Sequence, residues 1–175
     1  MEGPAVKGLE RLLSGRDERA LLQWHILRDF DVVVQVSLNI PGLPKAMTGD
    51  RELVSLVLER ICSASILTGS RPRILFFLDN GAGFAGMTGI KDVDPALVKR
   101  LGMGLEDREW GPVVDVDVIT RNGAIHRKRL TGEERPCLLC GMPAKDCARS
   151  RRHAFLDLRG AFQKLLIGAL EELRG

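Results

Sequence analysis

Three features are absent or weak in this sequence: a long apolar run, a secretory signal and a large excess of one charge. No apolar run approaches the ~20 residues that cross a bilayer, and the first residues lack the charged-then-apolar order of a signal peptide. We therefore expect a cytoplasmic protein with no membrane partner. The net charge of +3 is too small to indicate, by itself, a protein that binds nucleic acid.

The chain has the size and composition of one ordinary globular domain. Its 175 residues are 45% hydrophobic and 28% charged, which lies far from the composition of disordered or fibrous proteins. A chain of this length buries roughly two-thirds of the surface that it exposes when unfolded. We expect a single domain over residues 1–175.

Positive charge is concentrated in one part of the chain. Between Arg121 and Arg152, nine Lys or Arg residues stand against three acidic ones, whereas the rest of the chain is net acidic. This asymmetry predicts a local site for a small polyanion. The alternative is a solvated basic edge that binds nothing.

Hydrophobic periodicity predicts an α/β (α+β) fold in which helices flank one mixed sheet. Apolar residues recur at helical spacing after Ser14 and Asp17, which suit a helix start, and again from Leu53 to Ile61. The β-branched run "DVVVQVSLNI" indicates a buried strand. Strands are expected near 32–38, 73–78, 113–119 and 124–130, and helices near 15–28, 51–67, 95–105 and 154–173.

A glycine-rich segment, "GAGFAG" at 81–86, has the bare G-x-G-x-x-G spacing after a strand. A dinucleotide-binding loop would continue into a helix of a βαβ unit, but the following "MTGIKDVDP" is a poor helix start. We therefore expect a plain hairpin or a flexible loop.

Two aspartates alternate along the apolar run "VVDVDVI" at 113–119, just before the hairpin signal Asn122-Gly123. A strand has a period of two, so Asp115 and Asp117 share one face, and the intervening valines point into the core. Paired carboxylates suit Mg²⁺, which prefers hard oxygen ligands and often bridges protein carboxylates and substrate phosphates. D-x-D is a short pattern that also occurs by chance.

A cysteine cluster follows in "RPCLLCGMPAKDCARSRRH", with the spacing C-x2-C-x6-C-x5-H. The set Cys137, Cys140, Cys147 and His153 matches the Cys₃His ligands of a structural Zn²⁺ site, just before the C-terminal helix. A redox C-x-x-C and free thiols that pack remain alternatives. Cys62 is expected to be a buried small apolar residue.

Arginines surround this cluster and form a fan of guanidinium groups, which bind phosphates bidentately. Each of them taken singly is equally compatible with an ordinary surface residue. The members of this fan are Arg135, Arg149, Arg151 and Arg152.

Four segments together resemble a known family. They are "LLSGRDERALLQ" at 12–23, "VSLNIPGLPK" at 36–45, "DVDVI" at 115–119 and "RPCLLCGMPAKDCARSRRH" at 135–153. Their order and spacing resemble the apo-citrate lyase phosphoribosyl-dephospho-CoA transferases, also called holo-citrate lyase synthases. The likeness covers nearly the whole chain and is weakest between Thr68 and Gly111.

The resemblance implies a nucleotidyltransferase-type reaction on a nucleotidyltransferase-like fold. A serine of the citrate lyase acyl-carrier subunit attacks the triphosphoribosyl group of 2′-(5-triphosphoribosyl)-3′-dephospho-CoA, and diphosphate leaves. The Asp pair would hold Mg²⁺ on the triphosphate, and arginines would neutralise the anionic donor.

Carried over by position, the resemblance implies that Asp115 and Asp117 bind the metal and that one of them, or a neighbouring carboxylate, accepts the serine proton. Glu106 is a candidate third carboxylate. Phosphate contacts are expected from Arg16, Arg19 and Lys45.

The sequence departs from the family pattern at one point. The family has G-R-L-W-D before the Asp pair, whereas Pro112 follows Gly111 here, so one positive charge is missing. Arg108 or Arg121 is a candidate replacement. A related acceptor, the malonate decarboxylase carrier, is therefore also compatible with the sequence.

The alternative from another class is a zinc-knuckle module without catalytic activity that binds nucleic acid or an acidic protein through its arginines. Such a module has no need of paired carboxylates, which would repel phosphate in the absence of a cation. The D-x-D strand therefore favours the enzyme, and no nucleic-acid partner is expected.

Overall fold

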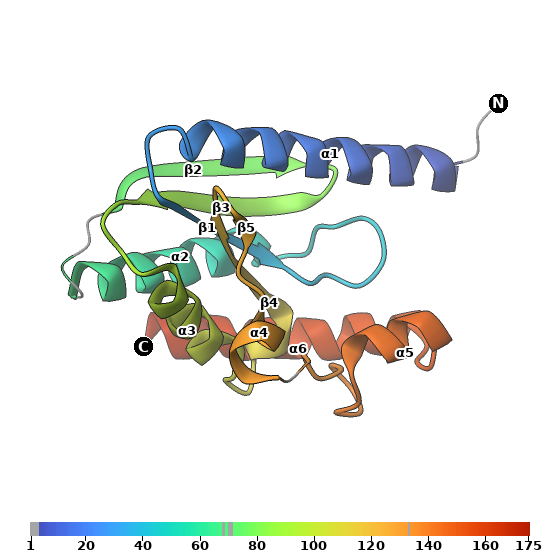
Figure 1. Ribbon diagram of the computed structural model, residues 1–175. Helices are drawn as coiled ribbons and strands as arrows, with labels where there is room; N and C mark the ends of the chain where they lie inside the picture. The colour runs from blue at the N-terminus through green and yellow to red at the C-terminus, as the bar shows by residue number, and fades with distance from the viewer. Residues whose placement is uncertain (1–3, 68, 70–71, 133) are drawn as a thin grey trace.

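The structure is a computed structural model that describes residues 4–67, 69, 72–132 and 134–175. Its helices and strands are interspersed along the chain and include two pairs of consecutive strands; Figure 1 shows their arrangement. In order they are α1 (Pro4–Ile26), β1 (Val32–Leu38), α2 (Asp50–Leu67), β2 (Pro72–Asn80), β3 (Gly83–Ile90), α3 (Pro95–Glu106), the 3₁₀ turn η1 (Gly111–Val113), β4 (Val114–Thr120), β5 (Gly123–Ala124), α4 (Arg127–Thr131), α5 (Ala144–Ser150) and α6 (Phe155–Arg174).

The strands form one five-stranded sheet in the order β2-β3-β1-β4-β5. The expected class, a sheet flanked by helices, is confirmed, but every described strand pair is antiparallel, so the expected mixed sheet is wrong. Tight turns join β2 to β3 and β4 to β5, which forces those pairs to be antiparallel. Helix α2 carries the chain from β1 to β2, with β3 lying between these two strands.

The two faces of the sheet are covered by different helices, with α1 on one face and α2 and α6 on the other (Figure 1). Successive side chains of β1 point to opposite faces of the sheet. Val32, Val34 and Val36 belong to the main core with α2 and α6, whereas Val33 packs with Phe30 in a smaller cluster on the α1 face. The continuous β-branched run in β1 is therefore explained by burial on both faces.

Two expected elements differ from the structure. The strand expected at 124–130 is reduced to the two residues of β5, and the chain then turns into α4. Arg127 ion pairs with Glu106 and Asp107 of the α3 end, which holds this segment away from the sheet edge. Helix α1 begins at Pro4 rather than near residue 15, and Ser14 lies inside it with its hydroxyl donating to Glu18.

The expected helices α2, α3 and α6 and the strands β1, β2 and β4 are confirmed. The glycine-rich segment 81–86 forms the turn of the β2–β3 hairpin and the first residues of β3, so the expected hairpin is confirmed and the segment continues into a strand. Within the described residues, no helix combines the length and the apolar character needed to cross a membrane.

Candidate active site

Asp115 and Asp117 lie on β4 and share the sheet face that α1 covers. Their cross-strand partners on β1 are Ser37 and Gln35. The alternating valines of β4 are fully buried on the opposite face, as expected from the period of two. The sheet therefore presents four polar side chains side by side at its centre.

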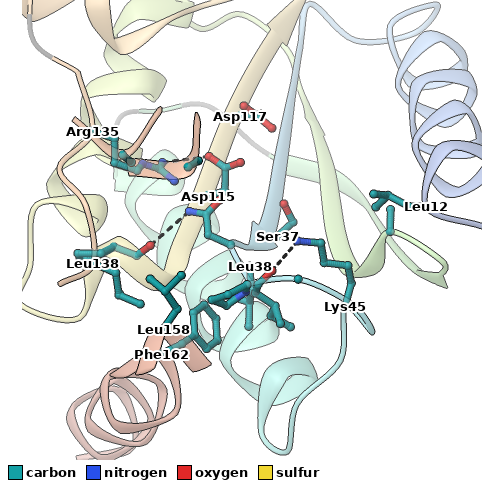
Figure 2. A pocket seen from close by; sticks show the side chains of 18 of the residues that line it. Leu12, Ser37, Leu38, Lys45, Asp115, Asp117, Arg135, Leu138, Leu158 and Phe162 are labelled. Carbon is teal, nitrogen blue, oxygen red and sulfur yellow. Dashed lines mark hydrogen bonds and ion pairs between the residues drawn. The ribbon is translucent and has the colours of Figure 1, made fainter. Parts of the chain in front are cut away.

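These polar side chains form the floor of a cavity of about 660 Å³, which we call the α1 cavity. Its walls come from α1, the loop after β1, the segment around the cysteine cluster and the start of α6. Figure 2 shows Asp115 and Asp117 of β4 and Lys45 of the loop after β1 projecting toward the same space. The cavity is large enough for a ligand of nucleotide size.

Asp117 has a strongly perturbed carboxyl group. Burial, followed by the negative charge of Asp115, raises its pKa to about 6. Gln35 donates a hydrogen bond to it at 3.4 Å, and Gln23 of α1 in turn donates to Gln35 at 2.9 Å. Two close carboxylates in this environment repel each other, and a divalent cation bound between them would relieve the repulsion.

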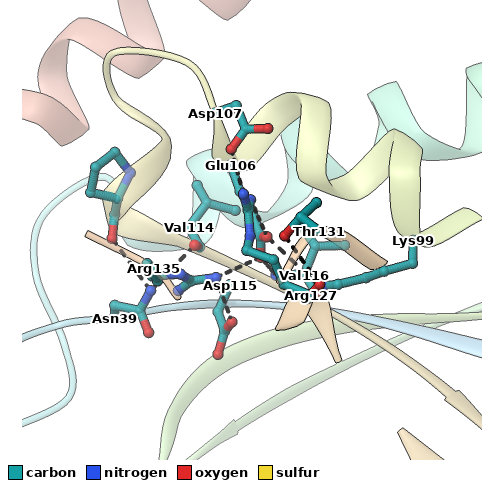
Figure 3. Close-up of polar contacts among 11 residues, drawn as sticks. Asn39, Lys99, Glu106, Asp107, Val114, Asp115, Val116, Arg127, Thr131 and Arg135 are labelled. Atoms are coloured by element: carbon teal, nitrogen blue, oxygen red, sulfur yellow. Dashed lines mark hydrogen bonds and ion pairs between the residues drawn. The ribbon is translucent and has the colours of Figure 1, made fainter. Parts of the chain in front are cut away.

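Asp115 forms an ion pair with Arg135, which precedes the cysteine cluster, at 3.0 Å. The Asp115 side chain remains 34% exposed, so the pair does not remove it from the cavity. Arg135 is itself held by Glu106 at 2.6 Å (Figure 3). Of the expected arginine fan, Arg135 is the member that lines the α1 cavity.

Glu106, the expected third carboxylate, does not line the α1 cavity, and ion pairs occupy its carboxylate where it lines a second cavity described below. Its side chain is 1% exposed and accepts hydrogen bonds from the Val116 backbone N–H, Arg127 and Arg135 (Figure 3). Lys99 lies 3.7 Å away. Cationic and backbone donors occupy both oxygens of Glu106, which thereby anchors Arg135.

Arg16, Arg19 and Lys45, the cations expected to contact phosphates, also line the α1 cavity. Arg19 is 8% exposed, and its guanidinium donates to the Ala82 and Gly83 carbonyls at 2.8 and 2.9 Å. Its Nε is buried without a hydrogen-bond partner in the described chain. Burial lowers the pKa of Arg19, and the charge of Asp117 opposes this shift.

Lys45 lies at the end of the loop after β1 and donates to the Ile40 carbonyl. Burial, and then the positive charges of Arg16 and Arg159, lower the pKa of Lys45. Within the described residues, Arg16, Arg19 and Lys45 form no ion pair with a carboxylate. This side of the cavity therefore carries positive charge that the protein itself leaves largely uncompensated.

Two features that position these cations were not predicted. The turn of the β2–β3 hairpin packs so closely on α1 that a Cβ at Gly81 would lie 2.1 Å from the Arg11 carbonyl oxygen. Arg159 of α6 donates to three carbonyls of the loop that carries Lys45. The glycines of the turn were visible in the sequence, but nothing in the sequence singled out Arg159.

The four cysteine and histidine ligands come together as expected, within 4.8 Å of one another. Cys140 Sγ lies 3.4 Å from Cys147 Sγ and 3.2 Å from His153 Nε2. Zn–S bonds of about 2.3 Å in a tetrahedron place ligand atoms about 3.8 Å apart, so this set fits a metal such as zinc with little movement. Hydrogen bonds from the Met142 backbone and Cys147 lower the pKa of Cys140 to about 6, which favours the metal-binding thiolate.

The remaining expected cations lie elsewhere. Arg149, Arg151 and Arg152 are exposed and do not line the α1 cavity. The two candidate replacements for the missing family arginine are also outside it, because Arg108 pairs with Glu172 and Arg121 donates to the Leu27 and Arg28 carbonyls.

A second cavity of about 540 Å³, the α4 cavity, opens on the other side of the Asp pair. It is lined by residues of α4 and α5 and shares Asp115, Asp117 and Arg135 with the α1 cavity. The carboxylates of Asp115 and Asp117 therefore line both the α1 cavity and the α4 cavity.

The family described as apo-citrate lyase phosphoribosyl-dephospho-CoA transferase matches residues 7–168. The chain belongs to this family. It is similar to a "Probable apo-citrate lyase phosphoribosyl-dephospho-CoA transferase" of Streptococcus pyogenes serotype M3, with 29% identity over 170 residues, 94% of this chain and 87% of that protein. A Vibrio cholerae serotype O1 protein of the same name is 28% identical over 160 residues, which cover 90% of each chain.

Membership in the transferase family confirms the resemblance found in the sequence. The matched span runs through the whole site, from Arg16 on α1 to His153 at the cysteine cluster. The family match therefore includes both carboxylates, the cations facing them and the four candidate metal ligands.

Proposed function

We propose that residues 1–175 act as one cytoplasmic transferase domain. It would move the phosphoribosyl-dephospho-CoA group from 2′-(5-triphosphoribosyl)-3′-dephospho-CoA to a serine of the citrate lyase acyl-carrier subunit and release diphosphate. Family membership supports the reaction. Free thiols at all four described cysteines fit a reducing compartment.

The observation that carries this proposal is the arrangement of charge in the α1 cavity. Two carboxylates face cations that the described protein does not pair with carboxylates. A polyphosphate chain complements both sides of the cavity. Arg16, Arg19 and Lys45 can bind its oxygens directly, and a divalent cation would join it to the two carboxylates. The Nε of Arg19 is buried without a hydrogen-bond partner in the described chain, so the protein does not use all the donors of this guanidinium.

Asp115 and Asp117 are the residues that would hold Mg²⁺, and their shared face and mutual repulsion fit that role. When bound, Mg²⁺ polarises a phosphoryl oxygen and offsets the charge on the departing diphosphate. Either carboxylate could accept the serine proton. The raised pKa favours Asp117, because a general base works best with a pKa near the operating pH.

Arg135 links the Asp pair to the cysteine cluster. It pairs with Asp115 and stands two residues before Cys137, which itself lines the α1 cavity. We propose that Zn²⁺ bound by Cys137, Cys140, Cys147 and His153 stabilises this wall and takes no part in the chemical step.

The test is to incubate the purified protein with the apo acyl-carrier subunit, the triphosphoribosyl donor and Mg²⁺, and to measure the intact mass of the carrier. We expect a mass increase equal to the phosphoribosyl-dephospho-CoA group, and the increase should be absent when the donor is omitted. A parallel incubation with the malonate decarboxylase carrier determines which acceptor is used. If neither carrier gains mass, the proposed reaction is wrong.

The alternative, a zinc-knuckle module for nucleic acid, is not favoured by the family match. Its expected signature is thermal stabilisation by short oligonucleotides and none by dephospho-CoA with Mg²⁺.

A further inference from the structure

A basic patch lies beside the α4 cavity. We define it as Lys128 and Arg129 of α4 with Lys145 and Arg149 of α5, all of which are exposed. Three of the four also line the α4 cavity. Among the described residues, Glu134 ion pairs with Lys128 at 3.1 Å, and Asp146 lies next to Lys145 on α5.

The cations of the patch lie close enough together to act on one carboxylate. The positive charges of Lys128, and then of Lys145 and Arg149, lower the pKa of Glu134. Cations of α4 and α5 therefore face the same region of the surface. In the part of the chain that the structure describes, Arg129, Lys145 and Arg149 form no ion pair. The patch therefore exposes a net positive charge to solvent, where a negatively charged partner can bind.

The α4 cavity connects this patch to the Asp pair, because Asp115 and Asp117 line it together with Arg129 and Lys145. The α1 cavity reaches the same carboxylates from the other side. Anything that enters between α4 and α5 therefore meets the carboxylates from the β5 side of β4, whereas Arg19 and Lys45 line only the α1 cavity, which lies over β1.

Phosphoryl transfer places the attacking and leaving oxygens roughly in line, on opposite sides of the phosphorus. If the polyphosphate runs from the Asp pair toward Arg19 and Lys45, the serine hydroxyl has to approach from the α4 side. The less exposed cations of the α4 cavity, Arg127 and Lys99, are paired with Glu106, and its unpaired cations, Arg129 and Lys145, are exposed. The inner part of this space therefore suits a polar chain segment better than a second polyphosphate.

We propose that the α4 cavity is the entrance for the acceptor serine, and that the basic patch docks an acidic surface of the carrier protein that bears this serine. This inference rests on the proposed function and adds the direction of approach and the charge of the partner. Complementary charge at the rim raises the association rate and orients the partner before the serine enters.

The experiment compares the double variant Arg129→Glu/Lys145→Glu with the control Arg60→Glu/Lys164→Glu. The control changes the net charge equally at exposed positions of α2 and α6 that line neither cavity. We measure the dissociation constant of the apo carrier subunit by calorimetry, and the KM values of carrier and donor in the transfer assay. In the patch variant we expect the carrier dissociation constant and KM to rise roughly tenfold or more, with the donor KM within about twofold.

The single variant Arg129→Glu, which leaves the cysteine cluster region unaltered, should show a smaller rise in the same direction. Higher salt should weaken carrier binding to the wild type more than to the double variant. Equal carrier affinity in the patch and control variants overturns the docking surface while leaving the transferase intact. Loss of oligonucleotide binding with unchanged carrier affinity overturns it in favour of nucleic acid. Calorimetry needs no turnover, so the docking surface is tested even if the mass assay fails.

Discussion

Replacement of Glu106 by Gln tests the buried charge network behind the Asp pair. Glu106 is 1% exposed, and Lys99, Arg127 and Arg135 lie within 3.7 Å of its carboxylate. At an effective dielectric constant of about 20, a charge pair at such contact distances contributes about 6 kcal/mol before desolvation is subtracted. Loss of one member of a buried pair typically costs about 3–5 kcal/mol, because the remaining charge stays buried.

The amide of Gln keeps one acceptor for the Val116 N–H, so we expect the lower end, a decrease of about 3 kcal/mol in the free energy of unfolding. For a chain of this length that corresponds to a fall in Tm of about 6–12 °C. The assay is urea denaturation followed by circular dichroism, with a thermal scan alongside. Loss of the anchor for Arg135 should also slow the transfer reaction.

The matched control is Asp79→Asn on β2. Asp79 pairs with Arg51 at the surface, where its side chain is 50% exposed, and such a pair contributes less than about 1 kcal/mol. Equal loss of stability in the two variants, or a urea midpoint of Glu106→Gln equal to that of the wild type, would contradict a stabilising buried network at Glu106.

Three further outcomes are expected. Asp115→Asn and Asp117→Asn should each lower diphosphate release by about a hundredfold or more without unfolding the protein, and near-normal turnover in both would exclude the metal site. Because the folded-state pKa of Asp117 is raised from 3.8 to about 6, its contribution to the stability of the metal-free protein should be most favourable below pH 4 and be lost as pH rises through about 6. The difference in unfolding free energy between wild type and Asp117→Asn then changes over that window, and a constant difference would contradict the assignment. Protein purified without chelator should carry one zinc equivalent, lost together with stability in Cys140→Ser but retained in Cys62→Ser; a stable, metal-free wild type would refute the zinc site.

Local sequence patterns were sufficient to predict much of this site. The alternation around Asp115 and Asp117 predicted a shared face because strand geometry has a period of two. The spacing of the cysteines and His153 predicted their cluster, since short separations leave little freedom to place them apart. The cations Arg16, Arg19 and Lys45 came from the family resemblance, and the α1 cavity brings them together.

Contacts between distant segments could not be predicted in this way. Glu106 looked like a candidate catalytic carboxylate until its pairing with Arg127 and Arg135, which follow it by 21 and 29 positions, placed it in a buried network. Arg127 also belongs to α4, the helix that occupies most of the segment 124–130, where a strand was expected.

Residue types and near neighbours establish which side chains carry charge or metal-binding groups, and which of them share a strand face or a short loop. The packing of α1, α4 and α5 around one sheet establishes which arginines face the carboxylates and which face solvent, because these contacts join segments that are far apart in the chain. It also decided that the Asp pair stands between two cavities.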